Sequence, residues 1–302
     1  MVFDVSKIKE LFPFPAFREH QEEILIDIVN SFNNGIDVYM LNAPVGSGKS
    51  PIGIDLGRMT DEYVDDDIVF GCYYSTPQKM LQDQLGKEFD EYIKIIKGRG
   101  SYPCSELIGN SCADGKCQID TKFECTKHCE YISARDAAMK GQIACSNFSY
   151  LIVVPPFIFK KRELLIVDEA HTCSVAAGAK AAWQQRYQLI RDISKKPGQH
   201  MMYLTATPHS GKAEQFSSLL GLIKPECQSL DLPAATQNQR RDLAKYYVQR
   251  RRADVEKWMN EDTPFPKRDA GEFQYDLSKK YSEFYDDILD FALGLTRSGD
   301  LH

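Results

Sequence analysis

The segment "LNAPVGSGKSPIG", residues 41–53, decides the fold of this chain. It begins within a short apolar run, "IDVYMLNA" (36–43), and ends within a predicted helix that contains "IGIDLGRM" (52–59). The spacing from Ala43 to Ser50 fits A-x-x-x-x-G-K-S, the pattern of a phosphate-binding loop (P-loop) between a strand and a helix. An ordinary glycine-rich turn is the alternative, but it would not require the lysine and serine in this context.

The residue types in this loop predict contacts with a nucleoside triphosphate. Gly46 and Gly48 let the backbone bend so that several N–H groups converge on phosphate oxygens. The helix N-terminus adds partial positive charge. Lys49 would reach the β- and γ-phosphates, and the Ser50 hydroxyl would hold Mg²⁺. The predicted loop for ATP and Mg²⁺ comprises Ala43, Pro44, Val45, Gly46, Ser47, Gly48, Lys49 and Ser50.

A second predicted strand, "LLIVDEAH" (164–171), ends in two adjacent carboxylates. Asp168 has the place of a carboxylate that binds Mg²⁺ through water, and Glu169 that of one that orients the attacking water in phosphoryl transfer. A solvated acidic strand end is the alternative, and it is common on its own. The occurrence of the acidic pair together with the P-loop favours Lys49, Asp168 and Glu169 as catalytic residues.

The composition is that of an ordinary globular protein. The chain has 302 residues, 43% hydrophobic and 26% charged, which allows one large domain or two small ones. Its net charge of -6 restricts any nucleic-acid site to a local patch. The start, "MVFDVSKIKELF", lacks the apolar region of a signal peptide, and the longest apolar run (151–159) is too short to span a bilayer. We therefore expect a cytoplasmic protein with no membrane partner.

Strands and helices alternate along the first two thirds of the chain. Near-continuous apolar strands are predicted at 36–43, 67–76, 141–147, 163–170 and 200–207, with helices at 17–32, 77–96 and 181–196. This pattern predicts an α/β fold whose parallel sheet is covered on both faces. After residue 211 we expect helices at 211–223, 237–259 and 279–296, and a strand at 272–278.

Five segments in order resemble the motifs of the first RecA-like lobe of superfamily 2 helicases and translocases, over residues 12–210. The P-loop and Asp168-Glu169-Ala170-His171, similar to a DEAH box, are two of them. The resemblance implies that Arg18 and Gln21 of "FREHQ" meet the adenine, that "STPQKMLQDQL" (75–85) contacts the nucleic-acid backbone, and that His171 is catalytic. For "LTATP" (204–208) the resemblance implies that Thr205, Ala206 and Thr207 couple the state of the bound ATP to the binding of nucleic acid.

The subfamily resemblance is divided. Up to about residue 170 the chain resembles XPD/DinG-like iron–sulfur helicases of compact phage type, through "KGRGSYPC" (97–104), "HCEYISARDAA" (128–138) and "IACSNFSYLI" (143–152). From about 168 onward it resembles Swi/Snf-type ATPases, through segments 204–226 and 247–278. An XPD-like protein would have Ser-Ala-Thr at 205–207, and a Swi/Snf-type protein would lack the cysteines. The first resemblance implies a phage-encoded protein in a bacterial host.

No segment resembles the second lobe of such motors. After "LTAT" there is no Q-x-x-G-R-x-x-R stretch that would supply an arginine finger. Phosphoryl transfer without that arginine is slower by ~10³- to 10⁵-fold. The resemblance therefore implies ATP binding with weak hydrolysis, and a second RecA-like lobe in trans as a partner.

Five of the nine cysteines lie between residues 104 and 129, spaced C-x₇-C-x₄-C-x₇-C-x₃-C. Four thiolates suit either a [4Fe–4S] cluster or zinc, His128 keeps a mixed zinc site open, and free thiols are the third alternative. The resemblance favours [4Fe–4S] held by Cys104, Cys117, Cys125 and Cys129, with Cys112 as a substitute for Cys117. We expect a lobe at 1–97 and 131–222, a metal-binding insert at 98–130, and a helical extension at 223–302.

The candidates for nucleic-acid contact are local: Lys79, Gln82, Asn147 and Tyr150. A lysine pairs with phosphate and a tyrosine stacks on a base, although a solvated helix face with ordinary tyrosines explains the same residues. The leading hypothesis is an ATPase lobe that depends on nucleic acid, with single-stranded DNA as ligand. The alternatives are a metal-stapled nucleic-acid-binding module that binds ATP without turnover, and a P-loop enzyme such as a kinase.

Overall fold

The structure, a computed structural model, describes residues 2–60, 64–65, 68–69, 71–120, 122–125, 128–154, 162–175, 181–207, 213–231, 234–250 and 278–298. The chain divides into two units, Met1–Thr263 and Pro264–His302. In the second unit the predicted C-terminal helix is present as α12 (Lys279–Ser298). Among the described residues, no helix is long and apolar enough to cross a membrane.

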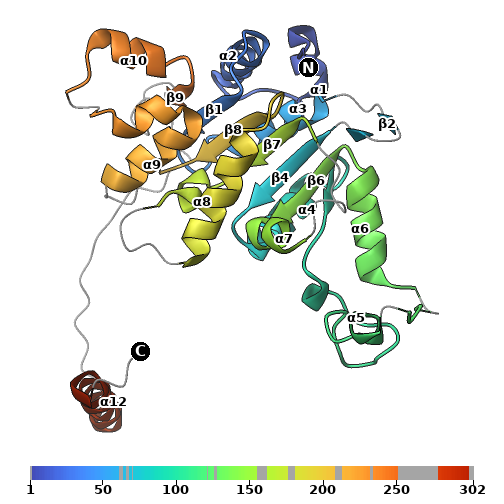
Figure 1. The fold of residues 1–302 in the computed structure, drawn as a ribbon, viewed down its shortest axis with the longest axis vertical. Helices are drawn as coiled ribbons and strands as arrows, with labels where there is room; N and C mark the ends of the chain where they lie inside the picture. The colour runs from blue at the N-terminus through green and yellow to red at the C-terminus, as the bar shows by residue number, and fades with distance from the viewer. Residues whose placement is uncertain are drawn as a thin grey trace. The chain divides into compact units, whose positions relative to one another are not determined.

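The first unit is built on a seven-stranded sheet with the order β5-β6-β4-β7-β8-β1-β9 (Figure 1). Every pair of neighbours in this sheet is parallel. The fold is therefore α/β with a RecA-like parallel sheet, as predicted. The strands are β1 (Val38–Asn42), β4 (Cys72–Thr76), β5 (Ile93–Ile95), β6 (Ile143–Asn147), β7 (Leu164–Val167), β8 (His200–Thr205) and β9 (Tyr247–Gln249), beside a separate antiparallel pair, β2 (Val64–Asp65) and β3 (Ile68–Val69).

Helices cover both faces of the sheet because strand side chains alternate between two cores. Tyr39 and Leu41 of β1 enter one core, while Val38 and Met40 enter the other. The first core is covered by α1 (Ile8–Leu11), α2 (Gln21–Asn33), α3 (Lys49–Arg58) and α4 (Lys79–Glu88). The second is covered by α7 (Phe148–Val153), α8 (Ala181–Ser194), α9 (Ala213–Ile223) and α10 (Gln237–Leu243), while α6 (Glu130–Lys140) packs at the β5–β6 end. The short helices are η1 (Val5–Lys7), η2 (Arg99–Ser101), α5 (Lys116–Ile119), η3 (Ala170–Cys173) and η4 (Pro225–Ser229).

Two predicted helices are wrong at their C-terminal ends. The helix expected over 77–96 stops at Glu88, because Phe89 leaves the helical conformation and buries its ring, and residues 93–95 pair with β6 as the strand β5. The helix expected over 237–259 ends at Leu243, and Tyr247–Gln249 instead pair with β1 as β9, while residues 251–259 lie outside the described residues. Both strands contain β-branched or aromatic residues that fit the edge of a sheet. The strand expected at 272–278 lies outside the described residues except for Ser278.

Helix α3 lies unusually close to the sheet. A Cβ atom at Gly53 would be 2.9 Å from Cε2 of Tyr74 in β4, and one at Gly57 would be 2.7 Å from Cδ1 of Ile143 in β6. Only glycine allows this approach, because any larger side chain would push the helix off the strands. The close packing fixes the N-terminus of α3, which carries Lys49.

A buried arginine joins α6 to the ends of two strands. Arg162 is only 2% exposed, and its guanidinium donates to the carbonyls of Cys72 (2.9 Å) and Gln142 (2.9 Å). It also donates to the carbonyls of Ala138 (2.9 Å) and Met139 (3.2 Å) in the last turns of α6. No described carboxylate pairs with it, so the negative end of the helix dipole and these carbonyl oxygens balance its charge.

A buried carboxyl group in α3 predicts a pH dependence of stability. Asp55 is fully buried, and neither of its oxygens has a hydrogen-bond partner among the described residues. Burial raises the pKa of Asp55 to about 8, against the opposing effect of the Arg58 guanidinium. In the unfolded chain this pKa returns to ~4. Between these values the folded state holds one more proton than the unfolded state, so stability falls as pH rises.

We therefore expect the unfolding free energy, relative to that of Asp55→Asn, to fall by up to about 1.4 kcal/mol per pH unit between roughly pH 4 and pH 8, and then to level off. Urea unfolding of both proteins across this range measures the difference. Parallel curves would show that Asp55 ionises in the folded protein as it does in the unfolded one.

Candidate nucleotide-binding site

The predicted P-loop connects β1 to α3 at the carboxyl edge of the sheet. Gly46 (φ 81°) and Gly48 (φ 83°) both have left-handed backbone conformations, and Gly48 directly precedes the first residue of α3. A residue with a side chain adopts this conformation only at a cost of about 1–2 kcal/mol, which explains why both positions are glycine. The loop is closed by Ser47, whose N–H and hydroxyl both donate to the carbonyl of Pro44, at 3.2 and 2.7 Å.

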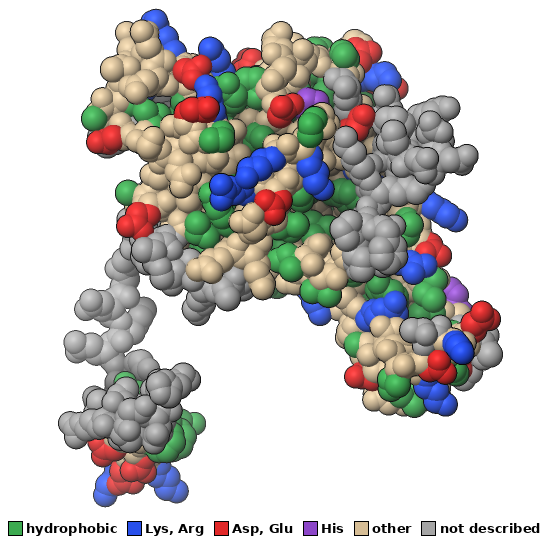
Figure 2. All heavy atoms as spheres, viewed as in Figure 1, with side chains coloured by type: hydrophobic (Ala, Val, Ile, Leu, Met, Phe, Trp, Pro, Cys, Tyr) green, Lys and Arg blue, Asp and Glu red, His purple; other side chains and the backbone are tan. Residues whose placement is uncertain are grey.

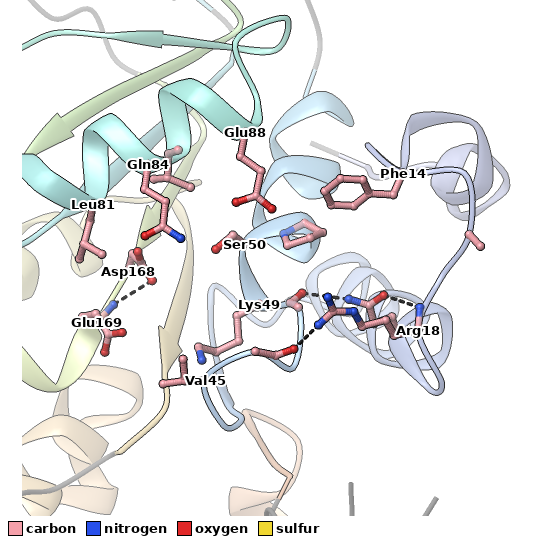
Figure 3. Close-up of a pocket in the computed structure, with 16 residues that line it drawn as sticks. Phe14, Arg18, Val45, Lys49, Ser50, Leu81, Gln84, Glu88, Asp168 and Glu169 are labelled. Atoms are coloured by element: carbon pink, nitrogen blue, oxygen red, sulfur yellow. Dashed lines mark hydrogen bonds between the residues drawn. The ribbon is translucent and has the colours of Figure 1, made fainter. Parts of the chain in front are cut away.

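The two residues predicted to meet the adenine hold one wall of this loop. The Gln21 amide donates to the Gly48 carbonyl at 3.0 Å, and the Arg18 guanidinium donates to the Gly46 carbonyl (Figure 3). Gln21 also accepts from the backbone N–H of Arg18 at 2.6 Å. The helix predicted from residue 17 begins at Gln21, because His20 before it has a left-handed backbone conformation (φ 61°).

Lys49 lies inside the loop. Its ammonium group donates to the carbonyls of Ala43 (2.9 Å) and Pro44 (3.0 Å). Burial lowers the pKa of Lys49, while the carboxylates of Glu169 and Asp168 oppose that shift. A partly desolvated ammonium beside two carboxylates and a converging loop is suited to a multiply charged anion.

The acidic pair follows β7 and faces the loop. Burial raises the pKa of Asp168 to about 7, with the neighbouring Glu169 as a second cause. Glu169 has a left-handed conformation (φ 49°), and its Oε2 lies 3.2 Å from Nδ1 of His171. This hydrogen bond is the main cause that lowers the pKa of Glu169. The pair thus holds one carboxyl that is partly protonated near neutral pH and one that is ionised.

His171 connects this pair to β8. Its Nδ1 also lies 3.2 Å from Oγ1 of Thr205, which donates to the carbonyl of Thr207 at 3.1 Å. Four predicted site residues, from the segments that follow β7 and end β8, therefore form a continuous polar chain: Glu169, His171, Thr205 and Thr207. Ala206 lies between the two threonines at the end of β8. The coupling role of Thr205, Ala206 and Thr207 stays a prediction.

The P-loop, the Arg18–Gln21 wall and the acidic pair share one cavity of about 380 Å³. Part of its lining is not predicted by the sequence, because the residues come from segments with no phosphate-binding pattern. They are Phe14, upstream of Arg18, and Gln84 and Glu88 on α4, all visible around the cavity in Figure 3. The ring of Phe14 packs on Phe89, with centroids 5.7 Å apart. The residues that line the cavity are Phe14, Ala16, Arg18, Gln21, Val45, Gly46, Gly48, Lys49, Ser50, Pro51, Leu81, Gln84, Leu85, Glu88, Asp168 and Glu169.

The oxygen donors in this cavity fit magnesium and a triphosphate. Ser50 and Asp168 supply a hydroxyl and a carboxylate, which are hard ligands of the kind that Mg²⁺ prefers. Lys49 and the N-terminus of α3 supply positive charge for phosphate oxygens.

The predicted nucleic-acid residues have different surroundings. Lys79 is exposed at the start of α4, and with Asn147 and Tyr150 it lines a second cavity of about 460 Å³. Tyr150 is only 5% exposed, and its hydroxyl lies 3.0 Å from that of Tyr131. Gln82 is fully buried and donates to the carbonyl of Ile96 at 3.0 Å. Packing accounts for Gln82, and its contact with nucleic acid stays an untested prediction.

Basic side chains are not concentrated on the face drawn in Figure 2. There, Lys and Arg alternate with Asp and Glu over the sheet and its covering helices. This distribution agrees with the net charge of -6 and leaves only local sites for an anionic polymer.

Four of the five clustered cysteines lie near one another in two pairs. Sγ of Cys112 is 3.9 Å from Sγ of Cys129, and a Cβ atom at Gly115 would be 3.5 Å from Sγ of both Cys104 and Cys117. Cys104 and Cys112 are buried in a small core with Ile96, Ala144 and other residues of the sheet edge. In the parts of the chain that the structure describes, no three His, Cys, Asp or Glu side chains are arranged as a metal site. The [4Fe–4S] cluster and its four ligands therefore stay a prediction.

The family described as "Type III restriction enzyme, res subunit" matches residues 15–210, well over half of the chain. The chain belongs to this family. The membership supports the predicted superfamily 2 helicase lobe. The XPD/DinG-like, Swi/Snf-like and phage-type assignments stay predictions. No curated protein matches the chain in sequence.

Two solved structures are similar to the chain. The SWI2/SNF2 ATPase core of Sulfolobus solfataricus, in complex with double-stranded DNA, is 11% identical with a TM-score of 0.46, over 78% of this chain and 44% of that one. The UvsW helicase of bacteriophage T4 is 14% identical with a TM-score of 0.42, over 72% of this chain and 66% of that one. The chain thus spans less than two thirds of the length of either protein.

The contact between Gln21 and the loop can be tested with two glycine substitutions. Gly48→Ala and Gly46→Ala place the same methyl group on the same left-handed backbone. The new Cβ at Gly48 would be 2.0 Å from Nε2 of Gln21, whereas at Gly46 nothing lies within 4 Å. We expect both variants to lose about 1–2 kcal/mol from backbone strain, and Gly48→Ala to lose about 1 kcal/mol more with the broken hydrogen bond.

Urea unfolding without nucleotide measures both losses. In a Gln21→Ala background the excess cost of Gly48→Ala should disappear. Equal losses for the two glycine variants would mean that Gln21 does not hold the loop.

Proposed function

We propose that this chain is the ATP-binding lobe of a nucleic-acid-dependent ATPase of helicase or translocase type, with Mg²⁺-dependent hydrolysis of ATP. The observation that supports it most directly is the shared cavity in which Lys49 and Ser50 of the P-loop face Asp168 and Glu169. Membership of the restriction-enzyme res-subunit family is consistent with this activity.

In this proposal, the loop amides and Lys49 bind the β- and γ-phosphates, and Ser50 with Asp168 holds magnesium. Magnesium, when bound, neutralises charge on the phosphate oxygens. Glu169 accepts a hydrogen bond from the attacking water and keeps it in line with the γ-phosphorus. The new bond forms between water oxygen and phosphorus as the bond to the β-phosphate oxygen breaks. ADP and phosphate leave, and the proton of the water goes to solvent.

Arg18 and Gln21 would hold the adenine beside the ring of Phe14, because all three line the cavity. Phe14 and Arg18 lie at the same end of it (Figure 3). His171 would act through its two hydrogen bonds, since it contacts both Glu169 and Thr205. A change at the γ-phosphate would thereby reach the end of β8.

Nucleic acid, with single-stranded DNA as the expected ligand, would lie at the second cavity. Lys79 and Arg99 supply positive charge there, and the guanidinium carbon of Arg99 lies 4.2 Å from the ring centroid of Tyr131. Such a combination of cations and aromatic rings is suited to single strands. The arginine finger would come from a second RecA-like lobe in trans, so turnover by this chain alone would be weak.

The first experiment is ATP hydrolysis with and without single-stranded DNA. We expect slow hydrolysis that DNA stimulates, and that Lys49→Ala abolishes by removing the charge that binds the phosphates. Lys87→Ala, an exposed lysine on α4 outside both cavities, is the matched control and should behave as the parent.

The alternatives predict other outcomes. ATP binding with no turnover under any condition would favour the nucleic-acid-binding module. Turnover that is indifferent to DNA and RNA would favour a small-molecule enzyme. Either result would contradict the proposed function.

The clustered thiols support a further proposal, a [4Fe–4S] cluster held by Cys104, Cys117, Cys125 and Cys129, with zinc as the alternative metal. We expect protein purified without oxygen to contain about four iron and four sulfide ions per chain. Cys104→Ser and Cys129→Ser should lose them, and Cys227→Ser, a buried thiol on the other core, should not. Zinc without sulfide would establish the alternative, and metal-free protein would contradict both.

Cys112 can be tested in the same way. It lies 3.9 Å from Cys129, which makes it a competitor for the place of Cys117. Iron content of Cys112→Ser and Cys117→Ser, compared side by side, shows which of the two is a ligand.

A further inference from the structure

Tyr74 brings a hydroxyl group beneath the P-loop. It lies in β4, between β6 and β7, and is fully buried. Its ring packs against α3 at Gly53, where a Cβ atom would come within 2.9 Å of it. Gly53 follows Ser50 by three residues, so both are on the face of α3 that meets the sheet. The ring therefore passes below the first turn of α3.

The Tyr74 hydroxyl has no hydrogen-bond partner in the part of the chain that the structure describes. An unpaired buried hydroxyl costs about 1–3 kcal/mol, so its retention needs an explanation. The charge of Asp168 and the hydroxyl of Ser50 both influence the pKa of Tyr74, after burial, so both groups belong to its surroundings. Burial raises the pKa of Tyr74 well above its usual value, so the phenol keeps its proton and can donate.

We propose that Tyr74 is a positioning residue for the magnesium site: when the cation is bound, its hydroxyl accepts a hydrogen bond from the Ser50 hydroxyl and donates one to the Asp168 carboxylate. The proposal rests on the proposed function, since it assigns Tyr74 to the residues that hold the cation there.

The chemistry of the two groups explains why a phenol is useful between them. A serine hydroxyl that gives a lone pair to a cation must direct its proton elsewhere, and the phenol oxygen is the acceptor on that side. The phenol in turn donates a hydrogen bond to one oxygen of Asp168, which leaves the other oxygen for the cation or for water bound to it. Both groups are thereby turned toward one point. The loss of a residue that hydrogen-bonds to metal ligands typically changes metal affinity by 10–100-fold.

The test compares Tyr74→Phe with Tyr203→Phe. Tyr203 is equally buried in β8 but belongs to the core on the other face of the sheet. Each substitution removes one hydroxyl and keeps the ring. The measurement is the affinity for a fluorescent ADP analogue, with Mg²⁺ and with a chelator in its place. The dissociation constant measured with the chelator, divided by that measured with Mg²⁺, gives the contribution of the cation to binding.

We expect Tyr74→Phe to reduce this ratio by about ten-fold and to leave binding without Mg²⁺ unchanged. Tyr203→Phe should leave both values unchanged. In an Asp168→Ala background the effect of Tyr74→Phe on this ratio should become smaller, because one of the two residues that it positions is gone. Unfolding in urea without nucleotide checks the fold, and Tyr74→Phe should be at least as stable as the parent, since it removes an unpaired hydroxyl.

An unchanged ratio in Tyr74→Phe would overturn the inference alone. Equal weakening of binding with and without Mg²⁺ would also overturn it, by showing that Tyr74 acts through packing. A parent protein whose affinity for the analogue does not depend on Mg²⁺ would overturn the proposed function together with this inference.

Discussion

The contact between α3 and the sheet is the constraint on which the rest of the site depends. Two glycines, Gly53 and Gly57, let the helix approach β4 and β6 at distances that a methyl group would prevent. The helix N-terminus, with Lys49 and Ser50, is thereby held at the carboxyl edge of the sheet, across from the residues that follow β7. A small displacement of α3 would move Lys49 and Ser50 together, and with them the proposed contacts to phosphate.

The electrostatics of the cavity balance a few partly buried charges. Burial lowers the pKa of Lys49, the hydrogen bond with His171 lowers the pKa of Glu169, and burial raises the pKa of Asp168 to about 7. In a low-dielectric site such charges interact strongly, so each depends on the others. A bound cation and phosphates would change the pKa values of all three groups. Because His171 contacts Thr205, such a change at Glu169 would have a physical route to the end of β8.

Much of the fold could be predicted because its signals are local. The P-loop and the strands around residues 40, 74, 145, 165 and 203 are apolar segments beside recognisable turns, and the structure has them where expected. The edge strands β5 and β9 were missed, because three-residue strands have no pattern of their own and form by pairing with a neighbour distant in sequence. The contribution of Phe14 and Glu88 to the site was missed for the same reason, since only tertiary packing brings them to the P-loop.

The position of β9 has a consequence for how the protein is made. The strand that leads into the P-loop, β1, is paired on one side with β8 and on the other with β9, which ends at Gln249. Its neighbours on both sides therefore emerge from the ribosome long after it does. Contacts so distant along the chain slow folding, and an unpaired β1 exposes free backbone groups that other chains can pair with. A nascent chain that stops short of Tyr247 would have the whole nucleotide-binding motif and still present an open, adhesive strand.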